Sequence, residues 1–369
     1  MGKRLKIIVS GGGTGGHIFP AISIANAIKE QRPDAEILFV GANGRMEMER
    51  VPAAGYNIVG LPVMGFPRRL GISMITFFIS LARSMRDARR VIKQFNPDVV
   101  VGVGGYASGP ILRVATQLKL PAVIQEQNSF AGVTNRLVAK RVSKICVAYE
   151  KMENYFPAAK IVHTGNPVRK NLIKISSLRD EALKFFGIDG SKKVILLVGG
   201  SLGARTLNES VMNSLGEIDG NNVDVIWQTG KYYYPEMLKR LEGKAHGNLH
   251  VFEFLSRMDY AYAVADLVIS RAGAGTISEL CLVEKPVVLV PSPNVAEDHQ
   301  TKNAMALVEK SAAVMVTDAE AREKLFSVSF GLLNDSDNLK SMSQNIALLA
   351  KPNAADDIAS IVIKLAEGK

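Results

Sequence analysis

Cysteine, tryptophan and long uncharged apolar runs are scarce in this chain of 369 residues. It has two cysteines, Cys146 and Cys281, both inside apolar segments, and one tryptophan. Buried, reduced thiols are expected there rather than a disulfide or a metal ligand. The longest nearly uncharged apolar stretch, residues 70–82, is shorter than the about 20 residues that a membrane-spanning helix needs. We therefore expect neither a disulfide-stabilised nor a membrane-spanning protein.

Acidic residues are also in the minority, with 35 Asp and Glu against 45 Lys and Arg and a net charge of +10. Such a balance suits nucleic acid, an anionic membrane surface or a polyphosphate substrate. The basic residues concentrate in residues 68–93, but the chain has no aromatic-interleaved ribonucleoprotein motif, zinc-finger spacing or basic zipper. Nucleic acid is therefore not an expected partner. The basic amino terminus leads into a short strand rather than a signal peptide, so we expect the chain to stay in the cytosol.

Three glycine-rich turns each follow an apolar run that is typical of a buried strand. They lie at residues 11–17 (GGGTGGH), 199–204 (GGSLGA) and 272–276 (AGAGT). Where a strand delivers a glycine turn to a helix N-terminus, free N–H groups and the positive end of the helix dipole favour a bound phosphate. One turn lies in the first half of the chain and two in the second. This distribution predicts one large phosphorylated ligand held between two similar domains.

Apolar strand-like runs alternate with helix-length amphipathic segments along the whole chain. This alternation predicts an α/β fold with parallel sheets and ligands at the carboxyl ends of the strands. A polar stretch after Gly165 precedes a new apolar strand, so we place a hinge there and predict domains at residues 1–165 and 166–350. Residues 351–369 are expected to form a helix that packs on either domain.

The first turn also fits the G-x-G-x-x-G pattern of dinucleotide sites through Gly11, Gly13 and Gly16. Such a site requires Asp or Glu at the end of the second strand, where the acid holds the ribose. Here the second apolar run, residues 36–40, leads into Gly-Ala-Asn-Gly instead. The missing acid argues against an oxidoreductase.

Seven motifs in order resemble those of the bacterial glycosyltransferases that convert lipid I to lipid II. They occupy residues 12–17, 104–110, 125–128, 165–169, 199–204, 270–279 and 297–301. Members of this family transfer N-acetylglucosamine from UDP-N-acetylglucosamine (UDP-GlcNAc) to undecaprenyl-pyrophosphoryl-N-acetylmuramyl pentapeptide (lipid I). The resemblance implies a GT-B fold, in which two Rossmann-like domains with parallel sheets face each other across a cleft. It also implies a peripheral enzyme at the cytoplasmic face of the inner membrane, with the acceptor and the membrane on the N-terminal domain.

The resemblance places most donor contacts on the C-terminal domain. It implies that Glu279 accepts bonds from the ribose, although this acid can instead serve only to stabilise a helix end. Leu255 is expected at the uracil, with core packing as the alternative, and Ser201 is expected at a helix start, where it can bond a phosphate. Arg169 resembles the family arginine near the nucleotide sugar, or is only a charge that bridges the domains. The implied donor-binding residues are Thr14, Gly15, Gly16, Asn128, Arg169, Ser201, Leu255, Ala274, Gly275, Thr276, Ile277, Ser278, Glu279 and Gln300.

The glycine-rich segment after the predicted fourth strand is the expected acceptor site, together with residues 14–16. Gly104 and Gly105 allow close approach of the backbone, and Ser108 can donate to a phosphate. Tyr106 lies in the same segment. A plain tight turn is the alternative interpretation.

An inverting transfer needs a base for the acceptor hydroxyl and stabilisation of the departing UDP. His17 is the first candidate, because its place at a helix start disfavours the imidazolium. Glu126 competes for the role, and a histidine that only positions phosphate is a further alternative. The chain's D-x-D, Asp335-Ser336-Asp337, lies in a polar run and is expected to be a helix cap. We expect no metal and no cofactor, because helix ends and Arg169 can meet the leaving charge.

Residues 66–83 are the expected membrane contact. At helical spacing, Phe78, Leu81, Met85, Ala88, Ile92 and Phe95 form a stripe that we expect to be buried. A second apolar patch, flanked by cations, is typical of a surface that dips into anionic headgroups; the alternative is a wholly buried helix. The expected membrane residues are Arg68, Arg69, Ile72, Ile75, Ile79, Arg83 and Arg86.

Two functions from other classes stay open. A UDP-sugar epimerase of the same architecture turns over the donor without a lipid acceptor. A non-catalytic nucleotide-sugar-binding membrane adaptor binds without turnover.

Overall fold

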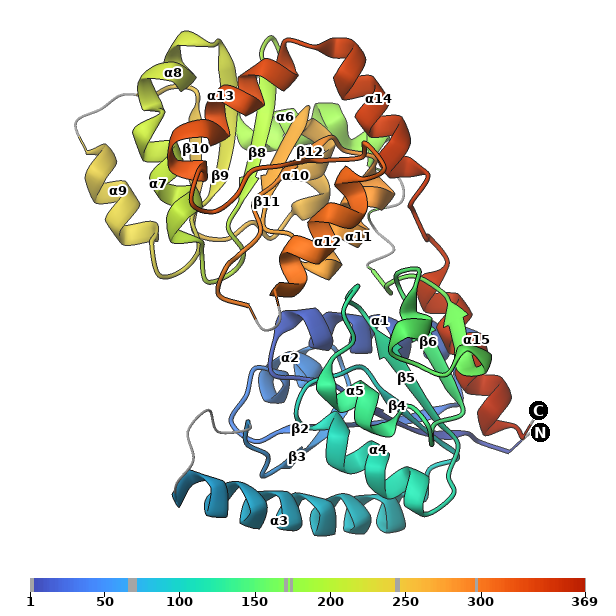
Figure 1. The fold of residues 1–369 in the computed structure, drawn as a ribbon. Helices are drawn as coiled ribbons and strands as arrows, with labels where there is room; N and C mark the ends of the chain where they lie inside the picture. Colours follow the sequence, from blue (N-terminus) through green and yellow to red (C-terminus); the bar gives the residue numbers. More distant parts are fainter. Residues whose placement is uncertain are drawn as a thin grey trace. The chain divides into compact units, whose positions relative to one another are not determined.

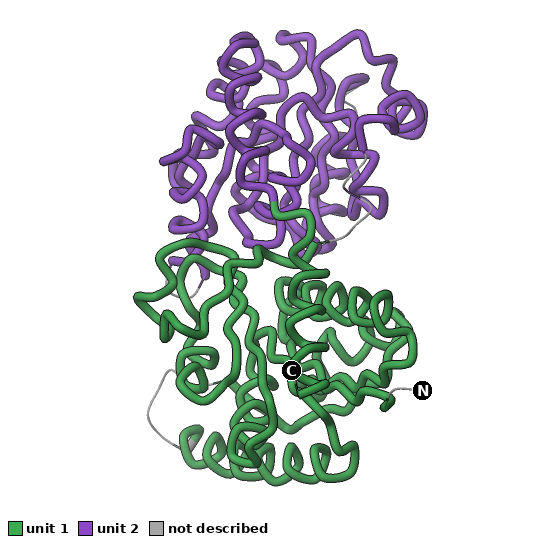
Figure 2. The backbone as a smooth tube through the Cα atoms, turned by 90° about the vertical axis from the view of Figure 1, so that its right-hand side faces the viewer, with its two compact units in different colours: residues 1–168, 351–369 green, residues 169–350 purple. Residues whose placement is uncertain are grey.

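The computed structural model describes residues 3–65, 72–168, 172, 175–242, 246–295 and 298–368. The chain divides into two compact units (Figure 2). Unit 1 comprises residues 1–168 and 351–369, and unit 2 comprises residues 169–350. The chain therefore leaves unit 1 shortly after Gly165 and returns to it for its last helix.

Unit 1 is built on a parallel sheet of seven strands in the order β3-β2-β1-β4-β5-β6-β7 (Figure 1). Its strands are β1 (Lys6–Ser10), β2 (Glu36–Ala42), β3 (Asn57–Leu61), β4 (Val99–Gly102), β5 (Ala122–Glu126), β6 (Lys144–Val147) and β7 (Ile161–His163). Its helices are α1 (Gly15–Gln31), α2 (Glu47–Ala53), α3 (Ile72–Phe95), α4 (Ser108–Gln117), α5 (Val133–Val138) and α15 (Ala354–Ala366), with short 3₁₀ turns at Met152–Asn154 and Ala158–Lys160.

Both faces of this sheet are covered, because successive side chains of a strand point to opposite faces. Ile7 and Val9 of β1 share a core with α1 and α15. Ile8 points to the other face and shares a core with α3, α4 and α5. The near-continuous apolar strands of the sequence are explained by this two-sided burial.

Unit 2 repeats the plan with a parallel sheet of six strands in the order β10-β9-β8-β11-β12-β13. Its strands are β8 (Lys193–Val198), β9 (Val223–Gln228), β10 (Leu249–Phe252), β11 (Leu267–Ser270), β12 (Val287–Leu289) and β13 (Val314–Met315). Its helices are α6 (Arg179–Phe186), α7 (Arg205–Asn213), α8 (Leu215–Gly220), α9 (Tyr234–Leu241), α10 (Met258–Val264), α11 (Ala274–Val283), α12 (His299–Val308), α13 (Ala321–Leu333) and α14 (Ser336–Ala347), after a 3₁₀ turn at Ser176–Leu178.

Each sheet starts with an inner strand and is extended first toward one edge and then toward the other. In unit 1 this change of direction lies between β1 and β4, and in unit 2 between β8 and β11. In open α/β sheets, ligands bind beyond the carboxyl ends of the strands at this switch point. The residues that follow β1, β4, β8 and β11 are the three glycine-rich turns and the segment at 104–110, so the topology alone selects them as the functional loops.

Candidate functional site

The turns after β1 and β4 touch each other in unit 1. Ser10 pairs with Gly102 at the ends of the two strands, so the turns start side by side. Gly105 has a φ of +83°, and a Cβ there would overlap the carbonyl oxygen of Gly12. Only glycine fits both the backbone conformation and this close approach.

His17 lies against the turn after β4. Its Nδ1 is 3.1 Å from Thr14 Oγ1, and its Nε2 lies 2.8 Å from where a Cβ at Gly104 would be. Because α1 begins at Gly15, its first N–H groups have no acceptors within the helix. Residues 14–17 and Gly104 and Gly105 are thus brought together, as an anion site with an adjacent imidazole requires.

Ser108 has a different bond from the one that we expected. Its side chain is fully buried, and its Oγ donates to Gly105 O at 2.9 Å. The hydroxyl thus closes its own turn rather than facing an open phosphate site. Tyr106 is 59% exposed and available to a ligand.

Glu126 is buried, and the bonds to its carboxyl group hold its own loop. Oε2 accepts from Gly132 N and Asn135 Nδ2, both at 2.9 Å, and Oε1 accepts from Asn128 N at 3.1 Å. Burial raises the pKa of Glu126, and these donors oppose that shift. The arrangement suits a residue that positions Asn128 better than one that takes a proton from a substrate.

Next to Glu126, a network of buried side-chain amides supports the end of β4. The motifs alone gave these amide residues no separate roles. Gln127 Nε2 donates to Val103 O at 2.5 Å, and Asn166 Nδ2 donates to Gln127 O at 3.0 Å. Gln125 Nε2 donates to Asn166 Oδ1 at 2.9 Å. These residues lie within the predicted motifs, but only the fold shows that they contact one another.

The turns after β8 and β11 are neighbours in the same way, because Val198 pairs with Ser270. The helix α11 begins at Ala274, so Ala274, Gly275 and Thr276 form its first turn as predicted. The expected helix start at Ser201 is wrong. Helix α7 begins at Arg205, because Gly200 and Gly203 adopt φ angles of +85° and +91° and extend the turn. Ser201 is exposed within that turn.

Arg271 and Asp318 connect the loops of the unit 2 sheet edge. Arg271 Nη1 is 2.5 Å from Asp318 Oδ1 and donates to Val290 O at 3.1 Å. Asp318 Oδ2 also accepts from Thr206 Oγ1, in the first turn of α7, at 3.0 Å. This pair fixes the starts of α7 and α11 relative to each other. Sequence reasoning missed Asp318, which lies 47 residues from Arg271 and outside every motif.

Glu279 is half-buried on α11, and its Oε2 accepts from Tyr262 Oη at 3.2 Å. Of the neighbouring predicted residues, Ile277 is buried in the core of the unit, and Ser278 Oγ donates to Ala274 O within the helix. Glu279 therefore offers an oriented carboxyl group, whereas Ile277 contributes packing.

Leu255 and Gln300 both have partners in unit 2. The Leu255 side chain is 4% exposed and belongs to the core, while its N–H donates to Gln228 Oε1 at 2.9 Å. Core packing, the alternative for Leu255, describes its side chain. Gln300 Oε1 accepts from Ser292 N at 2.9 Å, which leaves its amide N–H₂ as the donor for a ligand.

The remaining predictions concern a metal site, the helix cap at Asp335, the two cysteines and Arg169. Within the described parts of the chain, no group of three or more His, Cys, Asp or Glu side chains is arranged to hold a metal. Asp335 Oδ1 accepts from Asn338 N at 3.0 Å and caps α14, as predicted. Both cysteines are free and buried, which confirms that prediction, and burial raises the pKa of each thiol to about 12. Arg169 lies outside the described residues.

Helix α3 exposes more apolar surface than we expected. Ile75 and Ile79 are exposed as predicted, at 62% and 47%, but Phe78 and Leu81, expected in the buried stripe, are 59% and 38% exposed. The reason is that α3 packs on the core through its later turns, where Ser84, Ala88 and Ile92 are buried. Arg68 and Arg69 lie outside the described residues, as does the side chain of Ile72.

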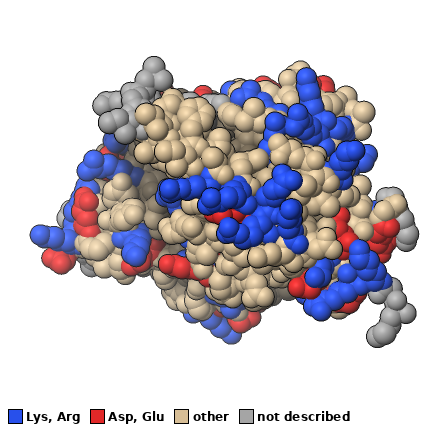
Figure 3. Space-filling model, turned by 90° about the horizontal axis from the view of Figure 1, so that it is seen from below, with Lys and Arg blue, Asp and Glu red and all other residues tan. Residues whose placement is uncertain are grey.

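Cations follow this exposed apolar surface along α3. Arg83 and Arg86 are exposed, and Figure 3, seen from below Figure 1, shows clusters of Lys and Arg separated by broad uncharged areas. None of the helices in the described ranges is long and apolar enough to cross a membrane.

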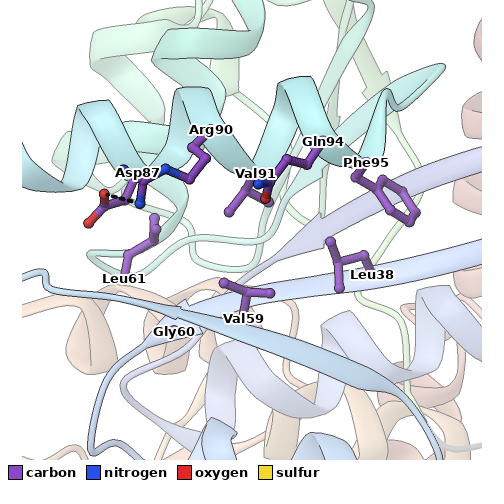
Figure 4. Close-up of a pocket in the computed structure, with 9 residues that line it drawn as sticks. All are labelled: Leu38, Val59, Gly60, Leu61, Asp87, Arg90, Val91, Gln94 and Phe95. Carbon is purple, nitrogen blue, oxygen red and sulfur yellow. Dashed lines mark hydrogen bonds and ion pairs between the residues drawn. The ribbon is translucent and has the colours of Figure 1, made fainter.

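A cavity of about 460 Å³ lies between the later turns of α3 and the strands β2 and β3 (Figure 4). Leu38, Val59, Val91 and Phe95 form its apolar walls, and Arg90 pairs with Asp87 at 3.4 Å. None of the predicted site residues lines it. The cavity is therefore separate from the loops at the switch point.

Two family models match the chain, one in its N-terminal part and one in its C-terminal part. Residues 7–147 match the N-terminal domain of glycosyltransferase family 28, and residues 194–358 match its C-terminal domain. A UDP-N-acetylglucosamine–N-acetylmuramyl-(pentapeptide) pyrophosphoryl-undecaprenol N-acetylglucosamine transferase of Parabacteroides distasonis is 58% identical over 100% of both chains. The chain belongs to glycosyltransferase family 28.

Solved structures agree with membership in family 28. MurG of Acinetobacter baumannii superimposes with a TM-score of 0.76 at 28% identity and covers 98% of this chain and 100% of its own. A putative UDP-N-acetylglucosamine 2-epimerase of Listeria monocytogenes has a TM-score of 0.69 over 100% of this chain and 98% of its own. At 15% identity, the epimerase shows only that the fold is shared. The two parallel sheets and the two family 28 domains together establish the GT-B fold.

Proposed function

We propose that the chain transfers N-acetylglucosamine from UDP-GlcNAc to lipid I and thereby forms lipid II. The observation that carries this proposal is the 58% identity, over the full length of both chains, to the transferase of Parabacteroides distasonis. The proposed reaction needs a diphosphate site for each substrate. Unit 1 and unit 2 each have paired loops at a switch point, so the fold can supply both.

The donor is assigned to unit 2. The first turn of α11, residues 274–276, presents N–H groups and the positive end of the helix dipole to the diphosphate. Glu279 accepts bonds from the ribose hydroxyls, and Leu255 is assigned to the uracil. The sugar hydroxyls are assigned to Gln300 and Asn128. This assignment is supported by the placement of Arg271 and Asp318, which hold the two donor loops without using the phosphate-facing N–H groups.

The acceptor pyrophosphate is assigned to the start of α1 and to Gly104 and Gly105 of unit 1, with Tyr106 beside them. In the transfer step, the acceptor hydroxyl oxygen bonds to the anomeric carbon as the bond from that carbon to the UDP oxygen breaks. The hydroxyl proton moves to His17 Nε2, and the electron pair of the broken bond leaves with UDP. His17 is preferred to Glu126, because the Glu126 oxygens already accept bonds from their own loop.

The leaving diphosphate is assigned to helix N-termini and Arg169, without a metal or cofactor. The support is physical: main-chain N–H groups at the start of α11 are fixed in place by the fold and need no reorganisation as charge develops.

The acceptor is attached to a lipid, and we propose that α3 binds the anionic cytoplasmic face of the inner membrane. The exposed apolar side chains Ile75, Phe78 and Ile79 lie on the same helix as the exposed Arg83 and Arg86. Apolar groups that enter the headgroup region beside cations are typical of interfacial helices.

The purified chain tests this proposal directly when it is supplied with labelled UDP-GlcNAc and a lipid I analogue. Label that appears in lipid II supports the transferase. Turnover of the donor without an acceptor indicates an epimerase, and binding of the donor without any turnover indicates an adaptor.

A further inference from the structure

Glu47 is a buried acid that neither the motifs nor the proposed reaction uses. It is the first residue of α2, and it has no solvent exposure. Burying a carboxyl group is unfavourable unless its oxygens receive hydrogen bonds. Its oxygens accept from two main-chain groups, Gly13 N at Oε2 and Ala42 N at Oε1, both at 2.9 Å. Glu47 therefore ties the glycine turn after β1 to the end of β2.

Two glycines leave room for this side chain. A Cβ at Gly12 would overlap the Glu47 carboxyl group, and a Cβ at Gly41 would lie 2.6 Å from Glu47 Cγ. Gly12 is therefore required by a group inside the protein rather than by close approach of a substrate. The Gly13 N–H is likewise bonded to Glu47, so the N–H groups left for an anion are those at the start of α1.

The turn that Glu47 holds also supports the rest of the acceptor site. Gly12 O lies against Gly105, and Gly104 lies against the His17 imidazole. A shift of Gly12 and Gly13 therefore moves the acceptor loop and the base together. We propose that Glu47 is a positioning residue of the acceptor site, whose carboxyl group fixes the turn after β1 in the conformation that binds the acceptor pyrophosphate. The inference rests on the proposed function, because it assigns this turn to the acceptor.

The test compares Glu47→Gln with Glu49→Gln, a matched control on the same helix whose side chain is exposed. Glutamine keeps the size of Glu47 but has a single accepting oxygen, so one of the two main-chain donors loses its partner. We expect kcat/KM for the lipid acceptor to fall about ten- to a hundredfold. The affinity for UDP should stay within about twofold of wild type, because UDP is assigned to unit 2. Glu49→Gln should match wild type in both measurements.

Hydrogen exchange supplies a readout that does not depend on catalysis. In Glu47→Gln, the peptides that cover residues 11–18 and 103–107 should exchange faster than in wild type, while α11 is unchanged. If Glu47→Gln melts below the assay temperature, Glu47→Asp is measured in the same way and should show the same acceptor-only defect.

A folded variant with wild-type acceptor kinetics and unchanged exchange overturns the inference. An equal fall in the affinity for UDP and in kcat/KM for the lipid acceptor also overturns the inference, because it indicates a general loss of stability. If the wild type itself forms no lipid II, the proposed function fails, and the exchange data still decide whether Glu47 holds the turn.

Discussion

Removing the carboxyl group of Glu279 should weaken nucleotide binding without unfolding unit 2. The side chain is half-buried on α11, where Tyr262 Oη donates to Oε2 at 3.2 Å. A hydrogen bond to a charged group contributes about 1.5–3 kcal/mol. Since 1.4 kcal/mol is about tenfold in affinity, Glu279→Ala should raise the Kd for UDP about ten- to a hundredfold. Glu279→Gln, which retains one accepting oxygen, should show a smaller loss.

Titration calorimetry with UDP measures this effect, and two variants calibrate it. Glu284→Gln neutralises an exposed acid at the other end of α11 and should bind UDP as wild type does. Tyr262→Phe leaves the carboxyl group in place but removes one of its donors, so its effect should fall between those of Glu284→Gln and Glu279→Ala. Unchanged UDP affinity in a folded Glu279→Ala would show that the acid only stabilises the helix end.

Three further predictions concern the base, the leaving group and the membrane. His17→Ala should keep its affinity for UDP and lose about 10² to 10⁴ in turnover, and a near-normal turnover number would exclude His17 as the base. Activity should largely survive excess EDTA; complete loss that manganese or magnesium restores would establish a metal requirement. The protein should sediment with anionic vesicles at low salt and be released at high salt. Ile75→Glu with Ile79→Glu should abolish sedimentation, whereas Leu348→Glu, at an exposed apolar residue of unit 2, should not; equal binding by the double variant would exclude α3.

Local signals in the sequence were enough to predict an α/β fold with parallel sheets, whereas the GT-B fold was implied by the resemblance of the motifs. Buried parallel strands are continuous apolar runs, and glycine turns mark the strand ends, so both can be recognised within a few residues. The start of α11 at Ala274 follows from such signals alone. The start of α7 does not, because Gly203 packs against Thr229 and Tyr233 of another loop, and only the fold shows this contact.

Contacts between distant segments could not be predicted from periodicity. The stripe on α3 was predicted correctly as helical, but Phe78 and Leu81 are exposed because the core covers only the later turns of the helix. Glu47 and Asp318 were missed for a related reason, since each bonds to loops that are far away in sequence. An isolated acid in a sequence carries no signal of such a role.

The return of the chain to unit 1 has a consequence for folding during synthesis. Helix α15 supplies Ile358, Ala359 and Val362, all with no solvent exposure, to the core that α1 and β1 share. Burying each of the two larger side chains contributes about 1.5–3 kcal/mol. Unit 2 is one continuous segment, and the described residues of its core include none from α15. Unit 1 can therefore complete its core only after the whole of unit 2 has been translated, and a nascent chain stalled before α15 lacks the helix that packs on the apolar face of α1.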